Sequence, residues 1–187
     1  MNHPLLFDFP QQFETERLLV RLPMPGDGAP LYEAMIHSLP ELKPWLEFAQ
    51  QVPSVEETEL NVRQAHIAFL ERKDLRMHIF HRETGAFIGS TGLHRINWEV
   101  PKFEIGYWID TRYSGQGYIT EAVKGLTDFS FRELHAQRLE IRCDSKNVKS
   151  RKVAERLGFE LEGILRRDSL SIDKRDWRDT CIYAKLR

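Results

Sequence analysis

The chain has 187 residues, of which 41% are hydrophobic and 29% are charged. This length suits one domain with a full core and is too short for two comfortable ones, and the composition argues against a disordered chain. The formal charge is −1, but residues 1–137 hold 13 Lys and Arg against 19 Asp and Glu, whereas residues 138–187 hold 14 against 9. The basic part suits an anionic ligand and the acidic part a cationic one, with ordinary solvated faces as the alternative.

Neither a membrane span nor an export signal is expected. No apolar run approaches the roughly eighteen residues of a spanning helix, and the opening MNHPLLFDFPQQF has no basic leader and no long apolar segment. Cys143 and Cys181 lie in strand-like runs with no other Cys or His at metal-ligand spacing. We therefore expect buried free thiols, no metal, and a reducing, cytoplasmic location.

The first half of the chain alternates helix and strand signals. RLLVRL (17–22) predicts a short strand, and Asp27 a helix cap before residues 29–36. Ser54 and Glu57 have the spacing of a capping box, which opens a helix that runs to Leu70. LRMHIFHR and AFIGSTGLHRI, joined by a tight turn at Gly85, then predict a β-hairpin.

The second half begins with KFEIGYWID (102–110), in which apolar and other residues alternate as in a strand. A helical stripe follows, then the strand RLEIRC, a helix over residues 150–157 that ends at Gly158, and two strands, FELEGILRRDSLSI and WRDTCIYAKL. The stripe consists of Ile119, Ala122, Val123, Leu126 and Phe129. The order of elements predicts an α/β or α+β class with a mixed sheet.

Gly115 and Gly117 lie between the strand that ends near Asp110 and the helix that begins near Tyr118. The first amides of a helix have no intrahelical partner and lie at the positive end of its dipole, so a phosphate satisfies both. Glycine leaves the backbone bare for such a ligand, although a turn that needs positive φ explains the pair equally well. The third glycine of a dinucleotide fingerprint and the Gly-Lys-Ser/Thr of a P-loop are both absent.

The order of these motifs resembles the GCN5-related N-acetyltransferases (GNAT family), and more narrowly their ribosomal-protein-acetylating branch. The motifs are EIGYWID, Arg112-x-x-Gly115-x-Gly117, Asn147-x-x-Ser150 and ERLGFELEG, and the likeness runs from about residue 14 to the C-terminus. It implies one N-acetyltransferase domain over residues 1–187. The implied fold is a mixed, mostly antiparallel sheet of six to seven strands, flanked by helices, with a splayed parallel pair.

The resemblance also implies a site for acetyl-CoA between the two splayed strands, residues 102–109 and 138–143. The strand backbone would meet the pantetheine and thioester, the loop would hold the pyrophosphate, and Asn147 would contact the cofactor. The implied residues are Tyr107, Trp108, Ile109, Arg112, Gly115, Gln116, Gly117, Tyr118, Ile119 and Thr120. Core packing for the side chains of Tyr107 and Ile109, and a helix cap for Asn147, are the structural alternatives. Lys149, Arg151 and Lys152 either meet the 3′-phosphate or are simply solvated.

For the chemistry, the resemblance implies a hydroxyl near the sulfur, and Ser150 is expected to protonate the departing thiolate. Glu104 is the candidate base, acting through a water, with a structural strand carboxylate as the alternative. Asp168 is the second candidate base, because some relatives carry an acid on the strand after G-F-x-x-E-G. Histidine chemistry is not expected, and His94 is the nearest candidate among the histidines because its strand adjoins the site strand. Trp45 is either core or a wall of the acceptor groove.

The expected activity is direct transfer of an acetyl group from acetyl-CoA to a primary amine, and the expected amine is the N-terminal α-amino group of a ribosomal protein or peptide. An α-amino group has a pKa of about 7.7 to 8.0, so a useful fraction is neutral at cellular pH. A lysine side chain has a pKa of about 10.4, about 3 units above cellular pH, and its deprotonation would cost on the order of 4 kcal/mol. The alternatives are acetylation of a small amine, such as a polyamine, amino acid or antibiotic, and a CoA-binding sensor without catalysis. No nucleic-acid or membrane partner is expected, and the resemblance allows a homodimer.

Overall fold

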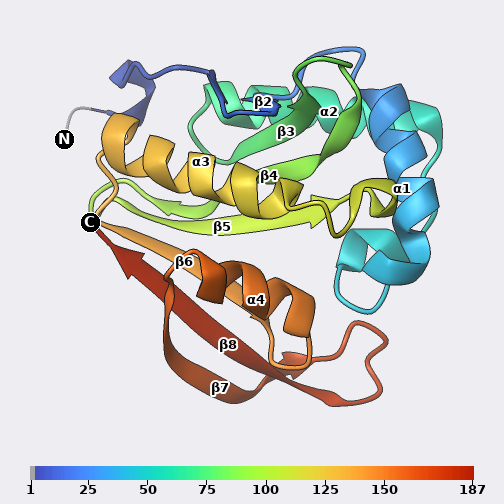
Figure 1. The fold of residues 1–187 in the computed structure, drawn as a ribbon, viewed down its shortest axis with the longest axis vertical. Coiled ribbons are helices and arrows are strands. Elements are labelled where there is room, and N and C mark those ends of the chain that lie inside the picture. Colours follow the sequence, from blue (N-terminus) through green and yellow to red (C-terminus); the bar gives the residue numbers. More distant parts are fainter. Residues whose placement is uncertain (1–2) are drawn as a thin grey trace.

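The computed structural model describes residues 3–187, in which eight strands form one mixed sheet (Figure 1). The strand order is β1-β2-β3-β4-β5-β6-β8-β7. Every neighbouring pair is antiparallel except β5 and β6, which are parallel. The strands are β1 (Gln12–Glu14), β2 (Leu18–Arg21), β3 (Leu75–His81), β4 (Phe87–Asn97), β5 (Lys102–Ile109), β6 (Arg138–Asp144), β7 (Glu160–Leu170) and β8 (Trp177–Leu186).

Helices cover both faces of the sheet. The α-helices are α1 (Gly28–Leu42), α2 (Val55–Leu70), α3 (Tyr118–Glu133) and α4 (Val148–Arg156), with short 3-10 helices η1 (Pro4–Leu6), η2 (Glu47–Gln50) and η3 (Thr111–Tyr113). Figure 1 shows α3 and α4 crossing the near face of the sheet. No helix of residues 3–187 is long and apolar enough to cross a membrane.

The alternation of side chains along the strands divides the core into two clusters. On the face of α3, buried strand residues such as Leu75, Met77 and Ile79 pack against the predicted helical stripe, all five members of which are buried. The opposite face carries a smaller cluster of buried residues from α1, α2 and β4: Leu31, Ala34, Met35, Val62 and Phe87. This second, thinner layer leaves room for a cavity between the helices and the sheet.

Most predicted elements are confirmed. Ser54 and Glu57 form the capping box reciprocally, the β3–β4 hairpin turns at Gly85, and Cys143 and Cys181 are buried free thiols on paired strands. The mixed α/β class with one parallel pair is also confirmed. The sheet has one strand more than the expected six to seven, because the three-residue β1 pairs with β2 but is too short to give a sequence signal.

The helix expected over residues 29–36 extends to Leu42, past Pro40. Its last turns are held by tertiary contacts: Leu42 is buried, and Ser38 Oγ accepts a hydrogen bond from the amide of Thr111 at 2.9 Å. The prediction that helix propensity would end α1 near Ile36 was therefore wrong. This contact also ties α1 to the segment that follows β5.

Asp27 precedes α1 as expected, but its side chain does not cap the helix. Its carboxylate instead accepts hydrogen bonds from both terminal nitrogens of Arg21 (2.7 and 2.8 Å) and from the Met24 amide, and it lies 2.9 Å from Nδ1 of the fully buried His78. Burial alone would raise the pKa of Asp27, but the bonds from His78, Arg21 and Met24 outweigh it and hold the pKa below its usual value. Asp27 thus links β2, β3 and the start of α1.

We predict that Asp27→Ala lowers the free energy of unfolding by about 3 kcal/mol, because it leaves Arg21 and His78 without their partner inside the protein. Asp128→Ala is the matched control, since it breaks only the exposed ion pair with Lys124 on α3, and should cost less than about 0.5 kcal/mol. Urea unfolding followed by circular dichroism at pH 7 measures both. Equal costs for the two variants would contradict the assigned role of Asp27.

Wild type and Asp27→Ala can also be compared as a function of pH. Because the pKa of Asp27 is lowered in the folded state, its contribution is complete above the unfolded value of about 3.9 and is lost as the pH falls towards the folded value. The part of the stability difference between wild type and Asp27→Ala that comes from the Asp27 carboxylate should therefore be constant from about pH 5 to 7. It should shrink below about pH 4.

Candidate functional site

The parallel strands β5 and β6 pair over only three residues. Lys102, Phe103 and Glu104 lie opposite Arg138, Leu139 and Glu140, and the pairing ends there. Beyond this point β5 continues against β4 as far as Ile109, and β6 continues against β8 as far as Asp144. The edge of β5 over residues 105–109 is therefore open towards β6, which is the splayed geometry that the resemblance implied.

The glycine loop lies directly beyond this open edge. Gly115 and Gly117 have φ values of +79° and +83°, which L residues adopt only under strain. No amide of residues 115–120 donates a hydrogen bond to any described protein atom. A Cβ built on Gly115 meets nothing within 4 Å, and one on Gly117 only Arg17 at 3.6 Å. The loop therefore needs glycine for its turns and also presents a row of open amides at the positive end of α3.

Arg112 is anchored at the end of β5 by a buried carboxylate. Its Nε and Nη2 donate to the carboxylate of Asp110 at 2.5–3.1 Å, and Asp110 is fully buried at the end of β5. The guanidinium is 44% exposed, so it is anchored on one side and faces solvent on the other. The hydrogen bond to Asp110 raises the pKa of Arg112, and the group keeps its positive charge beside the loop.

Sequence reasoning missed Arg17, which reaches the same loop from the start of β2. Its Nη1 donates to the carbonyl of Gln116 at 3.1 Å, its Nε binds Glu121 at 2.7 Å, and its guanidinium lies 4.3 Å from the ring centre of Tyr118. Glu121 also accepts hydrogen bonds from Thr15 and from the Arg17 amide. These contacts brace the loop and add a second positive charge, but no local pattern links residues about a hundred positions apart.

Ser150 and Asn147 lie at the start of α4, on the other side of the open edge. Asn147 Oδ1 accepts the Ser150 amide at 3.1 Å, so the predicted helix cap is confirmed. The Tyr107 hydroxyl lies 3.0 Å from both Oγ and the carbonyl of Ser150, and burial raises the pKa of Tyr107, which keeps its proton. Burial also raises the pKa of the neighbouring Cys143 to about 11, against a hydrogen bond with Ser150. Two hydroxyls thus meet where β5 and β6 part.

The three basic residues of α4 that could meet the 3′-phosphate lie outside the group formed by Tyr107, Asn147 and Ser150. Arg151 is engaged by Tyr183, the Ser145 carbonyl and Glu155, whereas Lys149 and Lys152 are exposed on α4. No three His, Cys, Asp or Glu side chains of the described chain group as a metal site would require.

A cavity of about 590 Å³ lies on the opposite face of β5, under α1 and α2. Trp108 forms part of its wall and packs against Phe48 and Phe87. Trp45 is half-buried and does not line it. Its wall is apolar towards α1 and mostly apolar towards the segment 46–53, and mostly polar towards α2 and the sheet, where Arg76, His78, Ser90, Thr91, His94 and Gly106 line it beside Tyr107 and Trp108. The cavity and the open edge therefore meet across the backbone of β5 at residues 106–108.

The two candidate bases share one arginine. Glu104 Oε2 lies 3.3 Å from Arg95 Nε and 4.0 Å from Arg142 Nε, and Arg142 Nη2 lies 3.6 Å from Asp168. Burial raises the pKa of Glu104, while Arg95 and Arg142 oppose that rise. Glu104 Oε2 is buried and accepts no hydrogen bond from any described residue.

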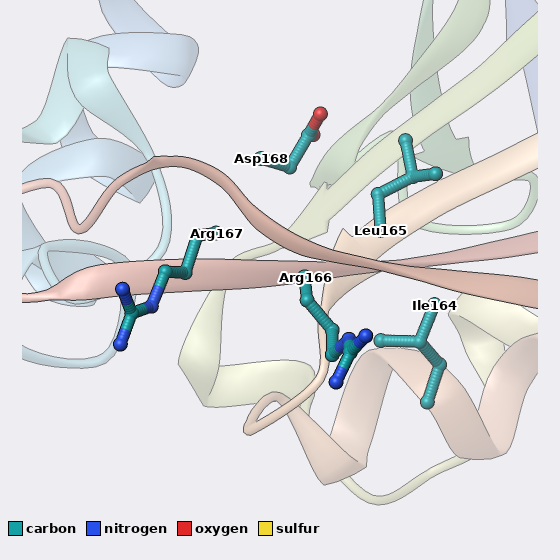
Figure 2. A pocket seen from close by; sticks show the side chains of 5 residues that line it. All are labelled: Ile164, Leu165, Arg166, Arg167 and Asp168. Atoms are coloured by element: carbon teal, nitrogen blue, oxygen red, sulfur yellow. The ribbon is translucent and has the colours of Figure 1, made fainter.

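Asp168 owes its position to an irregularity in β7. The register with β8 shifts between Leu165 and Ser169, and Arg167 has a φ of +52°. Figure 2 shows the result: Asp168 and Leu165 lie on one side of the strand, and Ile164, Arg166 and Arg167 on the other. These five residues line a shallow hollow. The bulge turns Asp168 towards Arg142 on β6, as bulges commonly re-aim one side chain.

Comparison with known proteins agrees with this geometry. The family model for the acetyltransferase (GNAT) domain matches residues 17–160. YdaF of Bacillus subtilis (strain 168) is 33% identical over 151 residues, which cover 80% of this chain and 81% of YdaF. The ribosomal-protein-serine acetyltransferase of Escherichia coli (strain K12) is 32% identical over 157 residues, which cover 84% of this chain and 86% of that protein.

Among solved structures, RimL, a ribosomal α-N-protein acetyltransferase in complex with coenzyme A, matches with a TM-score of 0.85. The match covers 92% of this chain and 95% of that one at 24% identity, and so bears on the fold alone. The family match spans the splayed strands, the glycine loop and the start of α4, which are the parts that form the site. The chain therefore belongs to the GNAT family and is an acetyltransferase that uses acetyl-CoA as its acetyl donor.

Proposed function

We infer that the protein transfers the acetyl group of acetyl-CoA to the N-terminal α-amino group of a ribosomal protein, as a single acetyltransferase domain in the cytoplasm. The observation that carries this proposal is the meeting of two half-sites across β5. One half is the open strand edge with the free amides of residues 115–120, and the other is the cavity under α1 and α2. A donor held on one half and an amine held in the other face each other near residues 106–108.

The donor half suits a pyrophosphate joined to an extended, amide-containing arm. The free loop amides and the guanidinium groups of Arg17 and Arg112 match the negative charge of the pyrophosphate. The open edge of β5 offers unpaired backbone groups to the amides of a pantetheine, as an added strand would. By the strand register the amide of Trp108 faces β4 and that of Ile109 faces the open edge, which supports Ile109 as the group that polarises the thioester carbonyl. Acetyl-CoA supplies the activated acetyl group when it is bound.

The surroundings of Ser150 support a role for it as the proton donor to the departing thiolate. Its hydroxyl lies at the parting of β5 and β6 and contacts Tyr107, whose own proton is retained because burial raises its pKa. Tyr107 therefore stays protonated and holds the Ser150 hydroxyl by a hydrogen bond, while Asn147 holds the start of α4 in place. We infer no acyl-enzyme, since burial raises the pKa of Cys143, the nearby thiol, to about 11 and keeps it protonated.

For the acceptor, the support is the shape and polarity of the cavity together with the relatives' substrates. The cavity volume lies within the usual range for small-ligand sites, about 300–1,000 Å³. Its mixed apolar and polar lining suits the first residues of a peptide. The ribosomal-protein-serine acetyltransferase of Escherichia coli acts, by its name, on a serine of a ribosomal protein. An α-amino group also has a larger neutral fraction at cellular pH than a lysine.

The loop assignment predicts that Gly115→Val weakens acetyl-CoA binding at least tenfold, since the new side chain covers the open amides and the backbone strains away from positive φ. Gly85→Val is the matched control: Gly85 has a φ of +70° and open space around it, but lies in the β3–β4 turn. Titration calorimetry with acetyl-CoA measures both. We expect both variants to be destabilised to a comparable degree and only Gly115→Val to lose binding. Native affinity for acetyl-CoA in Gly115→Val would refute the assignment of the loop as the pyrophosphate site.

Replacing Ser150 tests the proton donor. Ser150→Ala should lower kcat about tenfold and leave the acetyl-CoA dissociation constant within about threefold, a modest loss because a thiolate is already a fair leaving group at neutral pH. Steady-state kinetics with thiol detection gives kcat, and calorimetry gives the affinity. An unchanged kcat would remove Ser150 from the chemistry.

The acceptor is tested with a panel assayed by CoA release. It contains peptides with a free N-terminal Ser, Ala or Met, the same peptides with a blocked N-terminus and an internal Lys, spermidine, and an aminoglycoside. We expect kcat/KM for the free N-termini to exceed that for the other amines at least tenfold. Preference for a blocked peptide or a small amine would overturn the proposed substrate, and turnover of none would support a CoA-binding sensor.

A further inference from the structure

Neither acidic candidate for the base reaches the cavity that holds the amine. Glu104 is ion-paired with Arg95 and Arg142 and does not line the cavity, and Asp168 lies beyond Arg142 on β7. A general base must come within hydrogen-bond reach of the proton it removes, directly or through one water. The group that takes the amine proton should therefore be one of the residues that line the cavity.

His94 lines the cavity and is held by a carboxylate. Its Nδ1 lies 2.6 Å from Oδ2 of Asp74, in the turn before β3, and both side chains are about one-third exposed. A carboxylate on Nδ1 favours the tautomer with the proton on that nitrogen, which leaves Nε2 with a free lone pair. An Asp–His pair in this arrangement can accept a proton on Nε2 and share the resulting charge with the carboxylate.

The Nε2–Cδ2 edge of His94 faces Gly106, in the part of β5 where the two half-sites meet. A Cβ built on Gly106 would lie 2.9 Å from His94 Nε2 and 2.8 Å from its Cδ2, so the imidazole lies directly over the backbone of Gly106. Gly106 is the second residue after the last paired residue of β5, Glu104, where the edge opens towards β6. A side chain at this position would displace the ring, so a glycine here permits the contact.

We propose that His94, oriented by Asp74, is the general base that removes a proton from the acceptor amine. The proposal rests on the proposed acetyl transfer to an amine in the cavity. The amine nitrogen forms a bond to the thioester carbonyl carbon, and the excess proton on that nitrogen passes to Nε2 of His94. The carbon–sulfur bond breaks, the thiolate takes a proton from Ser150, and the Ser150 hydroxyl recovers a proton from solvent. The imidazolium, paired with Asp74, then returns its proton to water through its exposed edge.

The charged groups near His94 lie before β3, on β3, β4 and β5, and on α2. Asp74 and Glu104 are negative, whereas Arg76 on β3 and Arg95 on β4 are positive. From α2, Glu57 also lines the cavity, but its carboxylate is engaged by the amide of Ser54. Glu104 lies directly opposite His94 in the β4–β5 register. Glu104 is therefore a negative charge beside the base. Substituting Glu104 and His94 separately distinguishes a neighbouring charge from the general base.

The first experiment measures steady-state kinetics on the full chain with a peptide that carries a free N-terminal serine. His94→Gln keeps a donor for Asp74 but cannot act as a base, and should lower kcat about a hundredfold with acetyl-CoA affinity unchanged. Glu104→Gln should lower kcat less than about fivefold. His37→Gln, on an exposed site of α1, is the matched control and should behave as wild type. A hundredfold loss in Glu104→Gln with near-native His94→Gln would overturn the proposal.

A second experiment separates catalysis from packing. In His94→Ala, free imidazole at millimolar concentrations should restore kcat at least tenfold, and 1,2,4-triazole, which has the same shape and is less basic, should restore much less. Equal rescue by both would indicate that the ring only fills space, and would also overturn the proposal. Asp74→Asn, which alters a positioning residue, should lower kcat about tenfold with little change in KM.

These outcomes are distinct from failure of the proposed function. If the wild type turns over no amine, the proposed activity itself is wrong. If the wild type acetylates the peptide and His94→Gln retains its kcat, only the assignment of the base is wrong.

Discussion

The site depends on the short parallel pairing of β5 and β6. Each strand is held along its whole length by its antiparallel neighbour, β4 for β5 and β8 for β6, so the two can part after three paired residues without losing the rest of their hydrogen bonds. A sheet interior normally leaves no backbone group free, because an unpaired buried amide or carbonyl is costly. Parting the strands inside the sheet creates an edge that a ligand with amides of its own can complete.

The same opening organises the surrounding charges. The helix that follows β5 begins at the open end, with free amides at its positive end and with Arg17 and Arg112 beside them, each paired on one side with a carboxylate. On the other face, the thin packing of α1 and α2 leaves the cavity. One backbone segment therefore separates an anionic donor from an amine acceptor, and brings the two within reach of each other.

Two buried or half-buried Asp–His pairs border this cavity and serve different ends. Asp27 and His78 also bind Arg21, and the fully buried His78, whose pKa burial lowers, belongs to the support of α1. Asp74 and His94 are partly exposed, and the ring lies over Gly106. The residue types alone do not distinguish them. Burial and the neighbouring backbone decide which imidazole can exchange a proton with a substrate and with water.

The sequence by itself determined the elements and the motifs, because both rest on local periodicity and on residues close along the chain. The helical stripe of α3, the capping box of α2, Asn147 as a cap and the family resemblance could all be predicted this way. Only the tertiary structure decided that Arg17 braces the loop, that Asp27 binds β2 and β3 without capping α1, and that His94 reaches Gly106. These contacts join residues far apart in the chain, and their geometry is set by strand register and packing, for which a single sequence carries no local signal.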